Sequence, residues 1–113
     1  MPDWSIKIEG KPAVFTPDIE PFKPGKPLTV VQGDIVSWNN ESDDPHFPVP
    51  DDPATFGNFM LSEVTPGNSS AGYNVVAVSG STISYSCRLH PKERGQIVVV
   101  DFGASDIDGD LIA

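Results

Sequence analysis

Three side chains in this sequence have the chemistry of strong metal ligands. Cys87 is the only cysteine, and His46 and His90 are the only histidines, among 113 residues. Cys87 and His90 are three positions apart, so a tight loop allows both side chains to face one centre. One thiolate and two imidazoles are the donors of a trigonal copper site. We therefore expect the three side chains to meet around one copper ion.

Other roles for these residues compete with copper binding. A lone cysteine can be an inert buried thiol or a nucleophile as well as a ligand. A catalytic Cys–His pair needs its thiolate at a helix start or in a cleft, whereas Cys87 is expected to end a strand. Structural zinc usually takes four cysteine or histidine ligands, and this chain offers three. The set of donors therefore favours copper.

The elements that must position these residues are predicted to be short β-strands. Twelve prolines and ten glycines interrupt the chain, and no window repeats apolar residues at helical spacing. We expect strands at 4–8, 28–31, 35–38, 73–78, 82–87 and 97–102, with one short strand or helical turn in the irregular segment 43–66. Many short strands separated by turns favour an all-β sandwich. We expect a single domain over 1–103 and an acidic C-terminal tail over 104–113.

The charge pattern narrows the class of partner. The net charge of −9 argues against nucleic acid or an anionic membrane as the main partner. No Lys or Arg lies between Lys26 and Arg88, acidic residues flank His46, and basic residues return around His90. We interpret this as solvated loops or as a dipolar face that orients a partner. No apolar run approaches the roughly 18 residues of a membrane helix, so no membrane insertion is expected.

Three segments of the chain carry a resemblance to a known family. They are 33–40 (GDIVSWNN), the Pro45-His46 step and 85–100 (YSCRLHPKERGQIVVV). They resemble three parts of the cupredoxins, the small blue-copper family that includes plastocyanin and amicyanin. In order, these parts are the strand that leads to the first histidine ligand, the Pro-His step that supplies this ligand, and the ligand loop with the strand that follows it. The family's shortest ligand loop is Cys-x-x-His-Pro-x-Met-Arg-Gly, and residues 87–95 depart from it once. The resemblance implies a Greek-key β-sandwich that binds one copper ion (Cu2+/Cu+) through His46, Cys87 and His90.

Two positions differ from the family pattern. The residue after the first histidine is usually an asparagine that ties the two ligand loops together, and here it is Phe47; that tie must be replaced or missing. The axial methionine is replaced by Glu93, so the resemblance implies Glu93 as the fourth ligand. In the alternative, Glu93 faces solvent beside Lys92 or Arg94, and the axial place is empty, filled by water or filled by Met60. Met60 has apolar neighbours and is expected in the core.

A carboxylate ligand changes the expected properties of the ion. It is a hard, charged donor that prefers Cu(II) to Cu(I). With the thiolate of Cys87 and the carboxylate of Glu93 bound, the Cu(II) site is neutral and the Cu(I) site carries one negative charge, which is unfavourable to bury. We expect a lower reduction potential than in a methionine-ligated relative. The resemblance to Glu-ligated members of the family implies a red, tetragonal site rather than a blue one.

The expected function is that of a soluble electron carrier rather than an enzyme. The resemblance implies a redox partner that docks through a small, transient interface around His90, where Leu89 and Pro91 form an apolar collar. Arg88, Lys92 and Arg94 would steer an acidic partner. The alternative is a red or open copper site that performs redox chemistry on a small molecule such as nitric oxide. The resemblance implies a periplasmic or extracytoplasmic location, although the sequence begins without a signal peptide.

Overall fold

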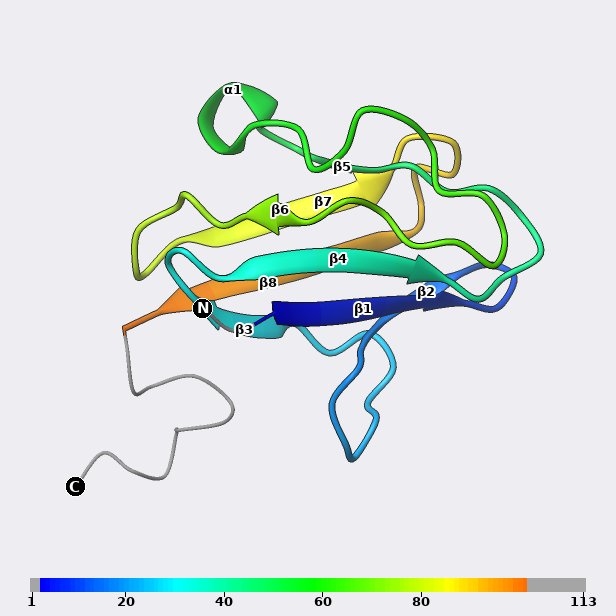
Figure 1. Cartoon of the computed structure of the whole chain (residues 1–113), viewed down its shortest axis with the longest axis horizontal. Coiled ribbons are helices and arrows are strands. Elements are labelled where there is room, and N and C mark those ends of the chain that lie inside the picture. Colours follow the sequence, from blue (N-terminus) through cyan, green and yellow to red (C-terminus); the bar gives the residue numbers. More distant parts are fainter. Residues whose placement is uncertain (1–2, 102–113) are drawn as a thin grey trace.

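The computed structural model describes residues 3–101, which form a sandwich of two β-sheets (Figure 1). The elements are β1 (Asp3–Glu9), β2 (Val14–Pro17), β3 (Leu28–Val31), β4 (Ile35–Asn40), β5 (Pro48–Pro50), α1 (Pro53–Phe56), β6 (Tyr73–Asn74), β7 (Thr82–Cys87) and β8 (Arg94–Val100). One sheet has the order β2-β1-β4-β6 and the other β3-β8-β7-β5. β1 runs parallel to β4, and β3 runs parallel to β8. The predicted all-β Greek-key sandwich is confirmed.

The core lies between the sheets because the strands bury every second residue. Trp4, Ile6 and Ile8 of β1 are buried, and so are Val36 and Trp38 of β4. This period of two is expected for strands with one face against another sheet. The register pairs Trp4 with Val36 and Ile6 with Trp38, so the buried residues of both strands lie side by side. Their sheet therefore presents a continuous apolar face to the other one.

An aromatic cluster fills the centre of this core. Trp38 stacks on Phe59 with ring centroids 4.6 Å apart, and Tyr85 meets Trp38 edge-on at 5.5 Å. The buried Tyr85 hydroxyl accepts a hydrogen bond from Trp38 Nε1 at 3.3 Å, and burial raises the pKa of this hydroxyl. Gly95 lies opposite Tyr85 in the β7–β8 register, and a Cβ at Gly95 would lie 2.4 Å from the ring. This packing fixes β7, the strand that ends at Cys87.

A buried acid holds the turn between β3 and β4. Oδ2 of Asp34 accepts hydrogen bonds from Trp4 Nε1 and from the backbone N–H of Val31, both at 2.9 Å. Gly33 has a φ of 95°, which glycine adopts without steric cost. The carboxylate therefore joins β1 to the turn and closes this end of the sandwich with the protein's own donors.

Two strands differ from the sequence prediction because apolar alternation does not mark them. β2 is not predicted, since it is a short edge strand that ends in Pro17, and proline is typical of edges rather than of strand interiors. β8 begins at Arg94, three residues before the predicted start. Gly95 and Gln96 carry no apolar signal, yet they pair with Tyr85 and Ser84 of β7.

The middle of the chain also differs in detail from the prediction. The segment 43–66 contains both β5 and α1 rather than one element. The predicted strand 73–78 forms a ladder only at β6, because Val75 bonds instead to the β3–β4 turn: Gly33 N–H donates to its carbonyl at 2.8 Å, and its own N–H donates to the Asp34 carbonyl at 2.9 Å. The predicted tail, 104–113, lies outside the described residues.

The loops that carry the candidate ligands gather at one end of the sandwich. Figure 1 shows the β1–β2 turn, the β4–β5 connection and the β7–β8 loop together at the right of the view. Pairing of Pro48 with Cys87 brings the start of β5 against the end of β7. The Asp34 turn lies at the other end, where Val31 pairs with Val100. Within residues 3–101, no helix has the length and apolar character needed to cross a membrane.

Candidate metal centre

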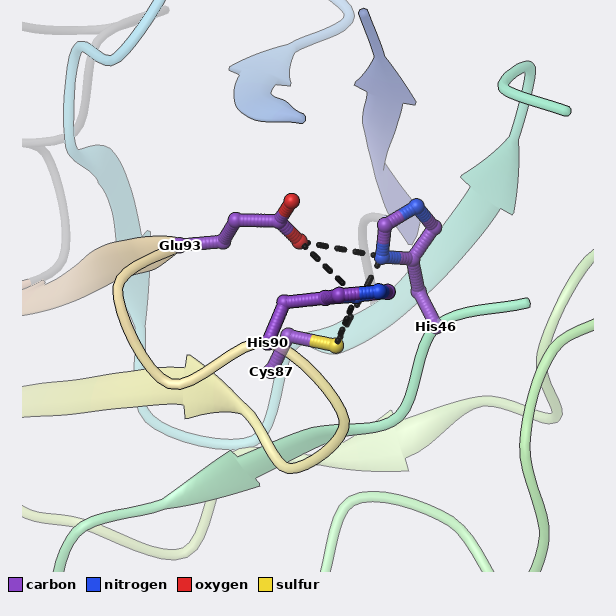
Figure 2. Close-up of side chains that lie close together, drawn as sticks. All are labelled: His46, Cys87, His90 and Glu93. Carbon is purple, nitrogen blue, oxygen red and sulfur yellow. Dashed lines mark hydrogen bonds and ion pairs between the residues drawn. The ribbon is translucent and has the colours of Figure 1, made fainter. Parts of the chain in front are cut away.

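Two loops bring the four candidate ligands together (Figure 2). His46 lies in the β4–β5 connection, Cys87 ends β7, His90 lies in the β7–β8 loop and Glu93 directly precedes β8. In this loop, the N–H of Cys87 donates to the Glu93 carbonyl at 2.9 Å, the N–H of His90 to the Cys87 carbonyl at 3.1 Å, and the N–H of Glu93 to the His90 carbonyl at 2.9 Å. These bonds fold residues 87–93 back on themselves, so the three side chains of the loop face His46.

The distances between the donor atoms fit a shared metal ion. Sγ of Cys87 is 3.5 Å from Nδ1 of His46 and 3.5 Å from Nδ1 of His90. Oε1 of Glu93 is 3.1 Å from His46 Nδ1 and 3.4 Å from His90 Nδ1. One donor atom from each residue lies within 4.8 Å of all the others. Bonds of about 2.0–2.3 Å place neighbouring ligands of a tetrahedral ion about 3.3–3.8 Å apart, so the cluster is close to the size that an ion requires.

Three of these side chains are buried and the fourth reaches solvent. The side chain of His46 is 2% exposed and that of Glu93 is 7% exposed, whereas His90 is 40% exposed. Cys87 is fully buried. Burial is the main cause that lowers the pKa of His46; the Glu93 carboxylate raises it, and His90 lowers it. A lowered pKa favours the neutral imidazole, which is the form that binds a metal ion.

Glu93 is a buried acid rather than a surface one. Oε2 accepts a hydrogen bond from the backbone N–H of Ala13 at 2.8 Å. Oε1 is the one buried side-chain nitrogen or oxygen without a hydrogen-bond partner among residues 3–101. A buried anionic oxygen without a donor is costly unless a cation binds it. Glu93 is therefore not a solvent-facing acid, and Arg94 pairs with Asp51 instead.

Backbone groups replace the side-chain tie that Phe47 cannot make. The N–H of Phe47 donates to Sγ of Cys87 at 3.4 Å, and its carbonyl accepts from the N–H of Arg88 at 2.8 Å. The next residue, Pro48, pairs with Cys87 in the β5–β7 ladder. The two ligand loops are therefore joined through the N–H and the carbonyl of Phe47 and through Pro48.

The residues that hold His46 were not found from the sequence. The backbone N–H of His46 donates to the Val64 carbonyl at 3.1 Å, and its carbonyl accepts from the Val64 N–H at 2.7 Å. Nε2 of its ring lies 2.9 Å from Oγ of Ser42, which also contacts the buried Asn40. The polar run 39–44 at the end of β4 was the available signal. A solvated loop has the same composition, so the signal was ambiguous.

The four predicted ligands are the only cluster of His, Cys, Asp and Glu side chains in the described part of the chain that could hold a metal ion. Met60, the alternative axial ligand, packs in the hydrophobic core, as expected. The donors are one sulfur, two imidazole nitrogens and one carboxylate oxygen. This set suits a borderline or soft ion such as copper, and it also suits zinc.

Comparisons with known proteins support the fold assignment. No protein-family model and no curated protein sequence matches the chain. Among solved structures, an oxidized variant of amicyanin matches with a TM-score of 0.55 and 21% identity, over 84% of this chain and 79% of that one. Amicyanin from Paracoccus versutus (Thiobacillus versutus) matches with a TM-score of 0.53 and 22% identity, over 84% and 80%. A reduced Cu(I) form of an amicyanin variant matches with a TM-score of 0.51 and 23% identity, over 84% and 81%.

Identity at this level is evidence for a common fold, which agrees with the sheet order and with the resemblance of the ligand segments. The amicyanins are cupredoxins. The chain therefore has the cupredoxin fold, and the cluster of His46, Cys87, His90 and Glu93 lies at one end of its sandwich.

Proposed function

We propose that the chain is a mononuclear copper protein that carries single electrons, with one ion held by His46, Cys87, His90 and Glu93. The observation that carries this proposal is Oε1 of Glu93, a buried oxygen without a donor that faces the thiolate and both imidazoles. Bound copper would supply a one-electron couple between Cu(II) and Cu(I). The amicyanin structures of similar fold include oxidized and reduced forms, one of them Cu(I), which supports copper as the ion.

Hydrogen bonds from the protein's own backbone position the donor atoms of the cluster. The N–H of Phe47 positions the sulfur of Cys87, and the N–H of Ala13 positions the carboxylate of Glu93. Both imidazoles already direct Nδ1 toward the sulfur. Donors fixed by packing and by outer hydrogen bonds keep their geometry when the charge of the ion changes. This arrangement suits electron transfer, because little of the site has to rearrange with each electron.

His90 is the proposed exit for the electron, because it is the ligand that reaches solvent. A shallow depression of about 430 Å³ lies beside it, lined by Lys11, Pro12, Asp44, His90, Pro91, Lys92 and Glu93. Leu89 is also exposed next to it. Electron-transfer partners usually meet through small, weak interfaces. We propose that a redox partner docks transiently on this surface.

The charges around His90 favour an acidic partner. Arg88 and Lys92 are exposed in the ligand loop. Arg94 contributes less than the sequence indicates, because it pairs with Asp51. Lys11, from the β1–β2 turn, pairs with Asp44 at 3.6 Å. Two exposed cations therefore remain in the loop that presents His90, and they would speed the approach of an acidic surface at low salt.

A red or open copper site that reacts with a small molecule such as nitric oxide is the second candidate. The depression that borders both His90 and Glu93 is the observation in its favour. The buried carboxylate opposes it, because Glu93 already offers a fourth donor at the cluster. Azide added to the Cu(II) protein separates the two candidates. An unchanged optical spectrum is expected for the electron carrier, and a new azide-to-copper band would favour the open site.

The location we propose is periplasmic or extracytoplasmic, and this rests on the resemblance of the ligand segments. The proposal can be examined with antibodies against the chain in fractionated cells. Recovery with the periplasmic fraction is expected, and recovery with cytoplasmic proteins would contradict it.

Copper titration of the metal-free protein tests the proposed function. We expect uptake of one Cu(II) per chain with a thiolate-to-copper absorption band and a matching paramagnetic-resonance signal. Cys87→Ser should lose the band, whereas the control Ser84→Ala, on the same strand, should keep it. The absence of any thiolate-to-copper band from the wild-type protein would overturn the proposal.

A further inference from the structure

The far side of the His46 ring has a dedicated partner. His46 is buried, and its Nε2, which points away from the cluster, lies 2.9 Å from Oγ of Ser42. A ring that binds a metal through Nδ1 must carry its proton on Nε2. This buried N–H needs an acceptor, because an unpaired one costs free energy. Oγ of Ser42 is within hydrogen-bond distance to be that acceptor.

The direction of the hydrogen bonds at Ser42 is set by Asn40. The Asn40 side chain is fully buried, and its Nδ2 donates to the carbonyls of Asp44 and Val64 at 2.7 and 2.8 Å. These two acceptors fix the orientation of the amide, so Oδ1 faces Ser42. Oδ1 then accepts from the N–H of Ser42 at 2.9 Å and from its hydroxyl at 2.7 Å. An Asn side chain has two N–H donors and two acceptor positions, and all four are used.

Toward His46, the Ser42 hydroxyl can therefore act only as a hydrogen-bond acceptor. Its single proton is directed to Oδ1 of Asn40, and the Asp44 carbonyl, at 3.0 Å, is a second acceptor for it. With its proton engaged, Oγ has two lone pairs left: one accepts from the N–H of Asp44 at 3.3 Å, and the other can accept the ring proton on Nε2. The alternative tautomer, with the proton on Nδ1, would direct that proton at Oε1 of Glu93, 3.1 Å away, and would block metal binding.

We propose that Ser42, oriented by Asn40, is a positioning residue that holds His46 in the tautomer with Nδ1 free for the metal. This role rests on the proposed function, since it serves metal binding by His46. Asn40 ends β4, and Ser42 lies in the loop after it. Val64 contacts both Asn40 and the backbone of His46. The ring is thus fixed at its backbone and at its outer nitrogen. Outer hydrogen bonds of this kind typically change metal affinity by about 10–100-fold.

The test compares Ser42→Ala, Ser42→Thr and Ser69→Ala. Ser42→Ala removes the acceptor, so Cu(I) and Cu(II) affinity should fall by about 10-fold or more. Ser42→Thr keeps a hydroxyl on a half-buried residue and should restore most of the affinity. Ser69 is exposed and bonds to Asn39, so Ser69→Ala should match the wild type. Thermal unfolding of each metal-free protein separates the loss of affinity from a loss of folding.

A second measurement does not depend on any variant. In the Cu(I) protein, which is diamagnetic, the Nε2 proton of His46 should give a slowly exchanging resonance coupled to nitrogen, because it is buried and hydrogen-bonded. Rapid exchange of this proton, or wild-type affinity in Ser42→Ala, would overturn the positioning role while leaving the copper site in place. A wild-type protein that takes up no copper would overturn the proposed function and this role together.

Discussion

Two buried carboxylates lie at opposite ends of the sandwich, and they differ in their partners. Oδ2 of Asp34 accepts from two N–H groups, those of Trp4 and Val31. Glu93 has one donor, the N–H of Ala13 on Oε2, and its Oε1 has none. Asp34 therefore ties strands together, whereas Glu93 leaves an anionic oxygen open toward the His46 ring. A buried acid with its donors supplied serves the fold, and one with an open oxygen is ready for a cation.

The largest predicted difference between the two ends is between the variants Asp34→Ala and Glu93→Gln, in their unfolding free energy and in their copper spectra. Asp34→Ala leaves two N–H groups without their acceptor, so the metal-free protein should lose about 3 kcal/mol of its free energy of unfolding. Its copper spectrum should match the wild type. Glu93→Gln keeps an acceptor for Ala13 and removes the unpaired charge, so metal-free stability should change by less than about 1 kcal/mol.

Urea unfolding of both metal-free variants, together with optical spectra of their copper forms, gives the comparison. Glu93→Gln should alter the spectrum while Asp34→Ala should not. If Glu93→Gln unfolds as easily as Asp34→Ala and leaves the spectrum unchanged, the carboxylate of Glu93 is structural and the contrast between the two ends is wrong.

Gly95→Ala tests how tightly the core between the two ends is packed around Tyr85. The added Cβ would lie 2.4 Å from the Tyr85 ring, and Tyr85 is two residues before Cys87 on β7. Overpacking of this kind should lower the free energy of unfolding by about 2–3 kcal/mol. Gln96→Ala, a substitution at the exposed neighbour, is the control and should cost little.

A double-mutant cycle with Tyr85→Leu identifies the cause of this loss. A smaller side chain gives room to the new methyl group, so the two substitutions should cost less together than the sum of their separate effects. Additive effects on the unfolding free energy would mean that the Tyr85 ring is not what excludes a side chain at position 95.

Glu93→Met changes only the end of the sandwich that carries the metal cluster, and it should raise the reduction potential. It replaces a charged oxygen donor with a thioether, which no longer favours Cu(II) over Cu(I). A charge interaction of about 1.5–3 kcal/mol corresponds to a rise of roughly 60–130 mV for one electron. The colour should shift toward blue as the copper–thiolate bond strengthens. Voltammetry and optical spectra measure both effects, and a wild-type potential in this variant would remove Glu93 from the ligands.

The sequence predicted the parts of the molecule that have a local signature. Short apolar runs between turn residues indicated β1, β3, β4 and β7, with period-two alternation in β1. The spacing of Cys87 and His90, with the Pro-His step at His46, indicated the cluster. β2 escaped prediction because a short edge strand with proline carries no such alternation. The start of β8 was not predicted because Gly95 has no apolar side chain. Its place in the strand requires glycine because the Tyr85 ring leaves no room for a Cβ.

The supporting contacts of the site could not be predicted, because they join segments far apart in the chain. Ala13 and Glu93 are separated by 80 positions, and nothing in the sequence near Ala13 indicates that its N–H contacts a carboxylate. The tie at Phe47 uses backbone atoms, which every residue type has. Hydrogen bonds from backbone N–H groups therefore cannot be predicted from residue types. Two such bonds position the sulfur of Cys87 and the carboxylate of Glu93.

The smallest expected effect concerns the exposed surface around His90. Arg88→Glu combined with Lys92→Glu reverses the exposed cations around His90. Oxidation of the Cu(I) protein by hexacyanoferrate(III), a trivalent anion, should slow about fivefold at low ionic strength and approach the wild-type rate in 0.5–1 M salt, roughly where the Debye length falls to a few ångströms. Lys23→Glu with Lys26→Glu gives the same change of net charge on the β2–β3 loop, and it should have a smaller effect if electrons leave through His90. Equal slowing in both double variants would show that net charge alone controls the rate, and the surface around His90 would then lose its special role.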